Sequence, residues 1–112
     1  MKKRNVVKSK ILFNDIIKIG ERISNKYYVI CSTIKSEVNN NFGIAVGKKV
    51  GNAVIRNKIK RQIRHIIDKN NKIFPNYHNY IIICKKEILF LSFQEMENEL
   101  IKLVHKGEEN EK

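Results

Sequence analysis

The sequence predicts an α+β fold, a two-layer α-β sandwich whose elements follow in the order α-β-β-α-β-α. Three observations support this. An isoleucine stripe recurs at helical spacing through residues 52–69, large and small residues alternate through 42–47, and a continuous apolar run at 80–84 suits a strand buried on both faces. A chain of 112 residues buries one core, so we expect a single domain over residues 1–107.

The elements of the first half are recognised by composition and spacing. Residues 1–9 are basic and poor in apolar side chains, which predicts a flexible N-terminal arm. Residues 11–19 carry apolar side chains at helical spacing, and Gly20 is placed to end this first helix. Residues 27–34 are rich in β-branched and aromatic side chains and predict the first strand, which a polar turn joins to the alternating second strand.

The second half contains the longest predicted helix. Asn52 can cap this helix, which runs to about Lys69, and a loop containing Pro75 separates it from the third strand. Ser92 can cap a last amphipathic helix, and the acidic tail 108–112 is expected to be disordered. The second strand, long helix and third strand form a crossover, whose default hand is right.

The sequence also bears on the cellular location of the protein and on whether it binds a metal. No stretch approaches the roughly 18 to 20 consecutive apolar residues of a membrane span, and no signal-peptide pattern follows the basic N-terminus. We therefore expect a cytoplasmic protein without membrane contact. Cys31 and Cys84 each lie in an apolar, strand-like run, which favours two reduced core thiols over a disulfide. The three histidines are too far apart in the sequence to predict a metal site.

The positive charge is segregated along the chain. From Val38 to Lys86 the only acidic residue is Asp68, against eleven lysines and arginines, whereas residues 87–112 hold seven of the eleven acids. This arrangement and the net charge of +12 point to a polyanionic partner.

One face of the long helix is almost entirely basic. Arg56, Lys60 and Arg64 follow one flank of the isoleucine stripe at i,i+4 spacing, where like charges repel by roughly 0.2 to 0.5 kcal/mol per pair. Asn57 and Arg61 continue round the far side. An ordinary solvated helix surface mixes both signs, so a surface of one sign is better explained by phosphates that neutralise it. The pattern predicts a face that binds RNA or DNA.

A glycine-flanked basic turn, Gly47-Lys48-Lys49-Val50-Gly51-Asn52, leads into this helix. Free backbone N–H groups and the helix dipole favour a phosphate there. The turn is not a P-loop, because the spacing is wrong and no Ser or Thr follows the lysine, and it lacks the GXXG spacing of a KH domain. The plain alternative is a tight strand-to-helix turn.

Catalytic side chains are not apparent. A protein nuclease needs clustered carboxylates for metal ions, or a positioned histidine with a partner. Asp15 and Asp68 are the only aspartates and are expected on helix surfaces, while the glutamates are concentrated in the C-terminal part. No catalytic residue and no protein metal site are predicted, so any active site would belong to a partner.

Residues 47–64 closely resemble the signature of the bacterial ribonuclease P protein family. The core of that signature, Arg-Asn-x-x-Lys-Arg-x-x-Arg, is met by Arg56, Asn57, Lys60, Arg61 and Arg64. Residues 13–20 and 79–85 look like the family's first helix and later strand. The resemblance implies a left-handed crossover and an accessory subunit that helps a catalytic RNA remove the 5′ leader of precursor tRNA. It also implies Mg²⁺ held mainly by RNA, and no required protein partner.

The resemblance assigns two groups of site residues. The signature helix and its turn would contact the catalytic RNA through Lys48, Lys49, Asn52, Arg56, Asn57, Lys58, Lys60, Arg61 and Arg64. A cleft between the first helix and the sheet would hold the single-stranded leader on Phe13, Ile17, Tyr27 and Cys31. Aromatic stacking suits such a cleft, because every base offers a π-face.

The chain departs from the family pattern at five positions. Ile17 and Cys31 replace aromatic residues, Lys58 replaces the motif's usual second arginine, Gly47 a serine, and Asn79 an aspartate. The alternative function is a ribosomal or other structural RNA-binding protein without a role in cleavage. Both functions require the basic helix, but only the first predicts a cleft for unpaired leader nucleotides.

Overall fold

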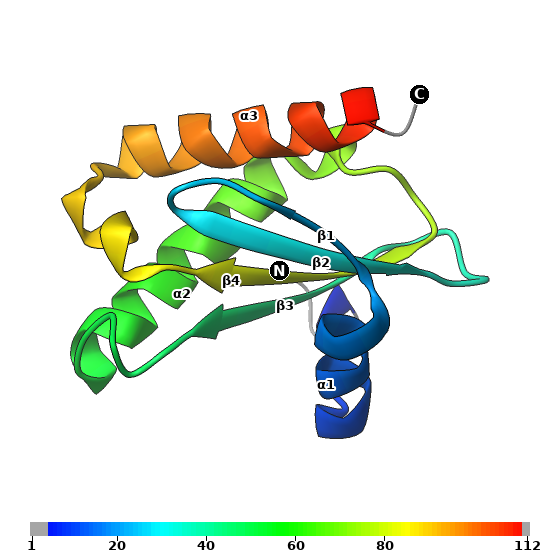
Figure 1. The fold of residues 1–112 in the computed structure, drawn as a ribbon, viewed down its shortest axis with the longest axis horizontal. Helices are drawn as coiled ribbons and strands as arrows, with labels where there is room; N and C mark the ends of the chain where they lie inside the picture. The colour runs from blue at the N-terminus through cyan, green and yellow to red at the C-terminus, as the bar shows by residue number, and fades with distance from the viewer. Residues whose placement is uncertain (1–4, 111–112) are drawn as a thin grey trace.

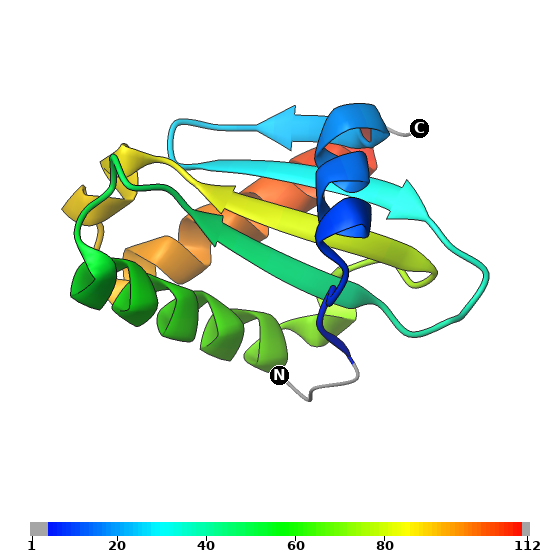
Figure 2. The same ribbon diagram turned by 90° about the horizontal axis from the view of Figure 1, so that it is seen from below.

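The computed structural model describes residues 5–110 and the side chains of residues 5–107. In chain order its elements are α1 (Lys10–Ile19), β1 (Glu21–Ser24), β2 (Tyr28–Ile34), β3 (Asn41–Val46), α2 (Ala53–Lys69), the 3-10 helix η2 (Asn71–Ile73), β4 (His78–Cys84), the 3-10 helix η3 (Lys86–Phe90) and α3 (Phe93–Asn110). A four-stranded sheet carries α1 on one face and α2 and α3 on the other (Figure 1, Figure 2). This confirms the predicted α+β fold, but α1 adds a helix layer on the second face of the predicted two-layer sandwich.

The sheet has one strand more than the sequence predicts. Its order is β1-β2-β4-β3, with β3 and β4 parallel and the other neighbours antiparallel. The missed strand, β1, is a short edge strand in which only Ile23 is partly buried, so it lacks a clear alternating pattern. Gly20 ends α1 as predicted and starts the tight passage into β1. A Cβ at Gly20 would lie 2.6 Å from the Ser32 carbonyl oxygen, so the close approach of β2 requires glycine.

The β3–α2–β4 connection is left-handed. In Figure 2, α1 lies on the near face of the sheet and α2 packs on the far face. Strands β3 and β4 both run to the left in that view, and β4 lies above β3. The default right-handed expectation is therefore wrong for this unit, and the hand implied by the family resemblance is present.

Two apolar clusters hold the layers together. The larger lies between the sheet and the helices α2 and α3, and it buries four isoleucines of the predicted stripe: Ile59, Ile63, Ile66 and Ile67. The smaller lies beneath α1, where Ile16 packs with Cys31 and Ile81. Strand β4 is consequently covered on both faces, as its continuous apolar run predicts.

Both cysteines are free and buried, which confirms the prediction of two core thiols. Cys31 belongs to the cluster beneath α1 and Cys84 to the cluster on the opposite face, so the sheet separates them. Burial raises the pKa of the Cys84 thiol to about 12. Its reactive thiolate form is therefore scarce at neutral pH.

Secondary structure reaches into both ends of the described chain. Val6 bridges to Phe42, and the Val7 N–H donates to the Phe42 carbonyl oxygen at 3.0 Å, so apolar residues fasten part of the expected flexible arm to the edge of β3. Residues 1–4 of that arm lie outside the described residues. Helix α3 continues past Gly107 to Asn110, into the expected disordered tail, because glutamate is a good helix former. Residues 111–112 lie outside the description.

Glu97 joins α3 to the end of α2. Its side chain is buried and accepts hydrogen bonds from Asn70 Nδ2 at 2.8 Å, Lys69 Nζ at 3.4 Å and Gln94 Nε2 at 3.4 Å. The Asn70 hydrogen bond, helped by Lys69, lowers the pKa of Glu97 below its ordinary value of 4.5. A depressed folded-state pKa means that the carboxylate stabilises the fold above the unfolded-state pKa. This contribution is lost as the pH falls through the folded-state pKa.

We therefore expect Glu97→Gln to lower the free energy of unfolding at neutral pH and to reduce its decline in acid. Urea unfolding followed by circular dichroism, repeated from neutral pH to below the ordinary carboxyl pKa, measures both effects. Glu87→Gln, in η3, is the control for loss of one negative charge. A Glu97→Gln protein with the wild-type stability and the wild-type pH profile would contradict this role.

Candidate nucleic-acid interface

The basic face of α2 begins at a capped helix end. The Asn52 side-chain oxygen accepts a hydrogen bond from the Ile55 N–H at 3.0 Å, which confirms the predicted cap and leaves the Asn52 amide nitrogen as a donor. Among the predicted contact residues beyond the cap, Asn57, Lys58, Arg61 and Arg64 are exposed, while Arg56 and Lys60 are half-buried on the flank of the stripe. The helix thus places the predicted RNA-binding side chains on its outer side.

The positive charge of this face is not neutralised within the described part of the chain. No described carboxylate forms a salt bridge within 4.0 Å of Lys60, Arg61 or Arg64. The first turn of α2 contains no acidic residue, so nothing there offsets the positive end of the helix dipole. The Arg56 Nε atom is buried and has no hydrogen-bond partner among the described atoms. The face is therefore suited to a chain of phosphates.

The turn before α2 extends this basic surface. Val50 is buried in the larger cluster, and its N–H donates to the Gly47 carbonyl oxygen at 3.0 Å, which closes the turn. Lys48 and Lys49 are exposed. Val50 thus anchors the turn in the core while both lysines face solvent.

On the other side of the sheet, α1 rests on the small face of β3. A Cβ at Gly43 would lie 2.7 Å from Cε2 of Phe13 and 2.6 Å from Cδ1 of Ile81. Only glycine therefore lets the Phe13 ring approach the strand so closely. The alternation of large and small residues that predicts β3 also explains where α1 packs.

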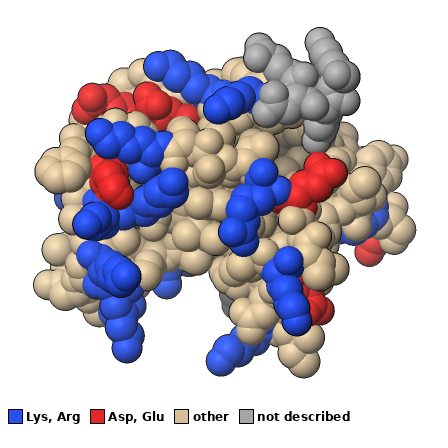
Figure 3. All heavy atoms as spheres, in the orientation of Figure 1, with Lys and Arg blue, Asp and Glu red and all other residues tan. Residues whose placement is uncertain are grey.

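Helix α1 leaves part of the sheet uncovered (Figure 2). We call the half-buried residues beside it the open sheet face: Val29, Ala45 and Ile83. Phe13 and Ile17 of α1 are half-buried and pack against the same small cluster as Val29 and Ile83. Figure 3 shows a hollow between α1 and the lobe that contains the start of α2, with Lys and Arg side chains on both sides of it. A narrow apolar floor thus lies between basic walls.

The structure does not bring all four expected cleft residues to this floor. Phe13 and Ile17 border it, but Cys31 is fully buried beneath α1 and supports the helix from below. Tyr27 packs against the larger cluster instead. It precedes β2, and the Asn25 side chain holds it in the turn by accepting a hydrogen bond from its N–H at 2.8 Å. Because Tyr27 lies in this turn and not in β2, its side chain does not share the strand face of Cys31.

Sequence reasoning missed the open sheet face, although a usable signal exists. Val29 lies two residues from Cys31, and Ile83 lies two residues from Ile81, so both point to the α1 side of their strands. What the sequence does not show is how far a helix of ten residues covers that side.

Neither metal ligands nor a membrane-spanning element is found in the part of the chain that the structure describes. Within residues 5–107, no three side chains of His, Cys, Asp or Glu gather as a possible metal site. Asp15 and Asp68 are exposed on α1 and α2, as predicted. No described helix is long and apolar enough to cross a membrane.

Comparison with known proteins gives one consistent family. The family model described as Ribonuclease P matches residues 1–108. The chain is 39% identical over 105 residues to the ribonuclease P protein component of Mycoplasma mycoides subsp. mycoides, an alignment that covers 93% of this chain and 96% of the relative.

Solved structures agree with this result. The RNase P protein from Thermotoga maritima matches with a TM-score of 0.82 at 27% identity, covering 90% of this chain and 96% of that one. The Staphylococcus aureus RNase P protein matches with a TM-score of 0.83 at 27% identity, covering 92% and 94%.

Proposed function

The chain belongs to the ribonuclease P protein family, and we propose that α2 with its preceding turn binds the catalytic RNA while the open sheet face receives the 5′ leader of precursor tRNA. Members of this family are the protein subunit of the ribonucleoprotein endonuclease that forms tRNA 5′ ends, and this chain has that role. A purely structural RNA-binding role is not favoured by these relatives.

The observation that carries the first proposal is the uncompensated charge of α2. Lys60, Arg61 and Arg64 lie off the buried stripe and have no described carboxylate within salt-bridge distance. Phosphates of a folded RNA supply negative charge that neutralises these side chains. Lys48 and Lys49 continue the same contact around the helix N-terminus.

The hollow beside α1 supports the second proposal. Its floor of Val29, Ala45 and Ile83 offers apolar contact without base-reading side chains, and the Phe13 ring is only half-buried. Such a surface accepts any base by stacking and packing, which suits a leader that varies in sequence. Basic side chains on both sides favour its phosphates.

Catalysis and metal binding are assigned to the RNA. Mg²⁺ ions that activate water need a cluster of oxygen ligands, which RNA phosphates supply. In this proposal the protein neutralises phosphates and positions the leader, acting where tRNA is processed, in the cytoplasm.

Phe13→Ala tests leader binding directly. We expect the assembled particle to bind precursor tRNA more weakly, by roughly 1 to 3 kcal/mol for one lost stacked base, while its affinity for mature tRNA stays unchanged. Equilibrium binding of both RNAs to the same particle measures the difference. Ile11→Ala, at a 75% exposed position of α1, is the control.

The packing of Phe13 on Gly43 requires a second variant. Phe13→Leu retains an apolar side chain against Gly43 but removes the aromatic face, so it should weaken precursor binding while preserving thermal stability. Equal losses for precursor and mature tRNA, in both variants, would make Phe13 a packing residue only.

A further inference from the structure

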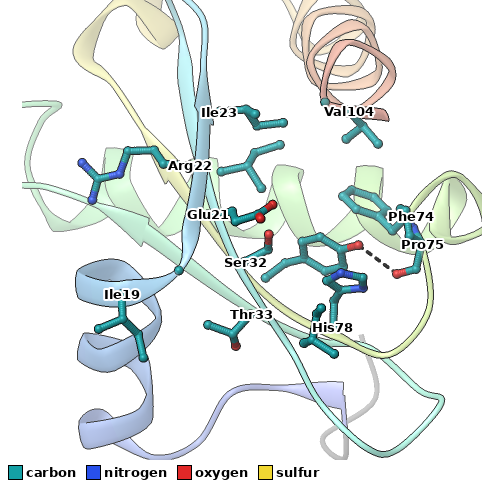
Figure 4. A pocket seen from close by; sticks show the side chains of 15 residues that line it. Ile19, Glu21, Arg22, Ile23, Ser32, Thr33, Phe74, Pro75, His78 and Val104 are labelled. Carbon is teal, nitrogen blue, oxygen red and sulfur yellow. Dashed lines mark hydrogen bonds between the residues drawn. The ribbon is translucent and has the colours of Figure 1, made fainter. Parts of the chain in front are cut away.

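A cavity of about 950 Å³ lies on the face of the sheet opposite α1 (Figure 4). The strands β1, β2 and β4, the segment after η2 and the end of α3 contribute its walls. Its apolar lining includes Ile23, Ile30, Phe74 and Val104, all part of the larger cluster or packed against it. None of the residues proposed to contact RNA lines it, so RNA binding would leave it free.

Three side chains offer hydrogen-bond acceptors to this cavity: Glu21, Ser32 and His78. Glu21 and Ser32 are paired across β1 and β2, and Figure 4 shows both side chains directed into the space that His78 also borders. His78 Nδ1 lies 2.7 Å from the Asn76 carbonyl oxygen, which can only accept, so Nδ1 carries the hydrogen. In the neutral ring Nε2 is therefore an acceptor. The Tyr80 hydroxyl already donates to the Pro75 carbonyl oxygen at 2.8 Å.

The described lining of the cavity holds one carboxylate, that of Glu21, although the protein is strongly basic. Glu21 is exposed and forms no salt bridge with the described residues. Ile19, the last residue of α1, lines the cavity, so the C-terminus of that helix, with its partial negative charge, borders it. Arg22 also borders it, but Figure 4 shows its guanidinium pointing away, and its Nη2 donates to the Ile17 carbonyl oxygen at 3.0 Å.

We propose that this cavity binds an arginine side chain of a partner polypeptide. A guanidinium presents several N–H donors in one plane, which matches the Glu21 carboxylate, the Ser32 hydroxyl and His78 Nε2. Its flat face can stack on the His78 ring, whose other face packs on Tyr80 with ring centroids 5.3 Å apart.

Two further features favour a polypeptide as the source of the guanidinium. Ile19 and Ile34 border the cavity with exposures of 75% and 81%, and they offer contacts to apolar residues that flank the arginine. Strand β1 is an edge of the sheet, so its outer backbone groups can pair with an extended segment. An RNA strand is disfavoured because Glu21 repels its phosphates.

The test is an NMR titration of the isotope-labelled full chain with a blocked Val-Arg-Val tripeptide. We expect saturable shifts confined to cavity residues such as Ile23, Ser32 and His78. The same peptide with citrulline in place of arginine keeps the shape without the charge and should bind at least about threefold more weakly. Shifts spread over the surface, equal binding of the citrulline peptide, or tighter binding of guanosine than of Val-Arg-Val would each overturn the proposal.

Two variants locate the binding. Glu21→Gln removes the carboxylate and Ile34→Lys adds a like charge at an exposed rim position, and each should weaken Val-Arg-Val binding by about threefold to fivefold. Glu87→Gln, at the other end of the sheet (Figure 1), should leave it unchanged. Wild-type peptide affinity in both cavity variants would overturn the proposal. Retained cleavage of precursor tRNA by the particle containing Glu21→Gln verifies that the variant protein is folded.

Discussion

Replacing Lys60, Arg61 and Arg64 together by alanine is expected to weaken binding of the catalytic RNA by about a hundredfold to a thousandfold. Each hydrogen bond between a charged side chain and a phosphate is worth roughly 1.5 kcal/mol or more, which is about tenfold in affinity. The three effects need not add fully, since the side chains share one helix face.

The salt dependence of binding distinguishes lost phosphate contacts from a damaged fold. Each phosphate contact contributes about one unit to the slope of log affinity against log salt, so the triple variant should lose about three units and each single variant about one. Binding isotherms at several salt concentrations give these slopes. Circular dichroism should show an intact fold, because none of the three side chains belongs to the buried stripe.

A second triple variant, which removes the same number of positive charges, distinguishes lost phosphate contacts from a lower net charge. Replacing Lys35, Lys102 and Lys106 by alanine also removes three positive charges, but from residues outside α2. This control should alter RNA affinity far less than the α2 triple variant. If the two triple variants behave alike, or if the α2 variant keeps the wild-type affinity and slope, α2 is not the RNA-binding face.

The sequence predicts those elements whose pattern of buried and exposed residues is complete within one segment. The isoleucines of α2 repeat at helical spacing, and Phe42, Ile44 and Val46 alternate with small residues, so each burial pattern is complete within its own element. The candidate RNA contacts on α2 follow from the same pattern, because the side opposite a buried stripe faces solvent. The buried and the solvent-facing sides of α2 are therefore predictable from the sequence alone.

The features that the sequence missed depend on packing between distant segments. Strand β1 is held by pairing with β2 and by the contact of Ile23 with α3 at Gly107. Its own four residues give little signal. The left hand of the crossover likewise depends on which face α2 covers. The open sheet face exists because α1 ends after ten residues, and Tyr27 leaves it because Asn25 forms a turn.

The second large effect concerns the source of catalysis. The purified protein alone should not cleave precursor tRNA at any magnesium concentration, and cleavage should appear when the catalytic RNA is added. The reason is chemical. Catalytic metal ions require clustered ligands, and within the described residues no three His, Cys, Asp or Glu side chains gather to supply them.

Magnesium should also partly replace the protein. If the protein acts by neutralising phosphates and positioning the leader, added Mg²⁺ screens the same repulsion within the RNA. Titrating magnesium over the catalytic RNA with and without protein should therefore show a protein effect that is large at low magnesium and small at high magnesium. A protein effect that stays constant across the titration would mean that neutralisation is not its main contribution.

Two aspartate variants complete this test. Asp15 and Asp68 lie on the surfaces of α1 and α2, so Asp15→Asn and Asp68→Asn should leave cleavage by the assembled particle near its wild-type rate. A trace of RNA in the preparation can imitate protein activity, so the protein is treated with a ribonuclease and repurified before the assay. Robust cleavage by this RNA-free protein, abolished by either aspartate variant, would place catalysis on the protein and overturn its assignment to the RNA.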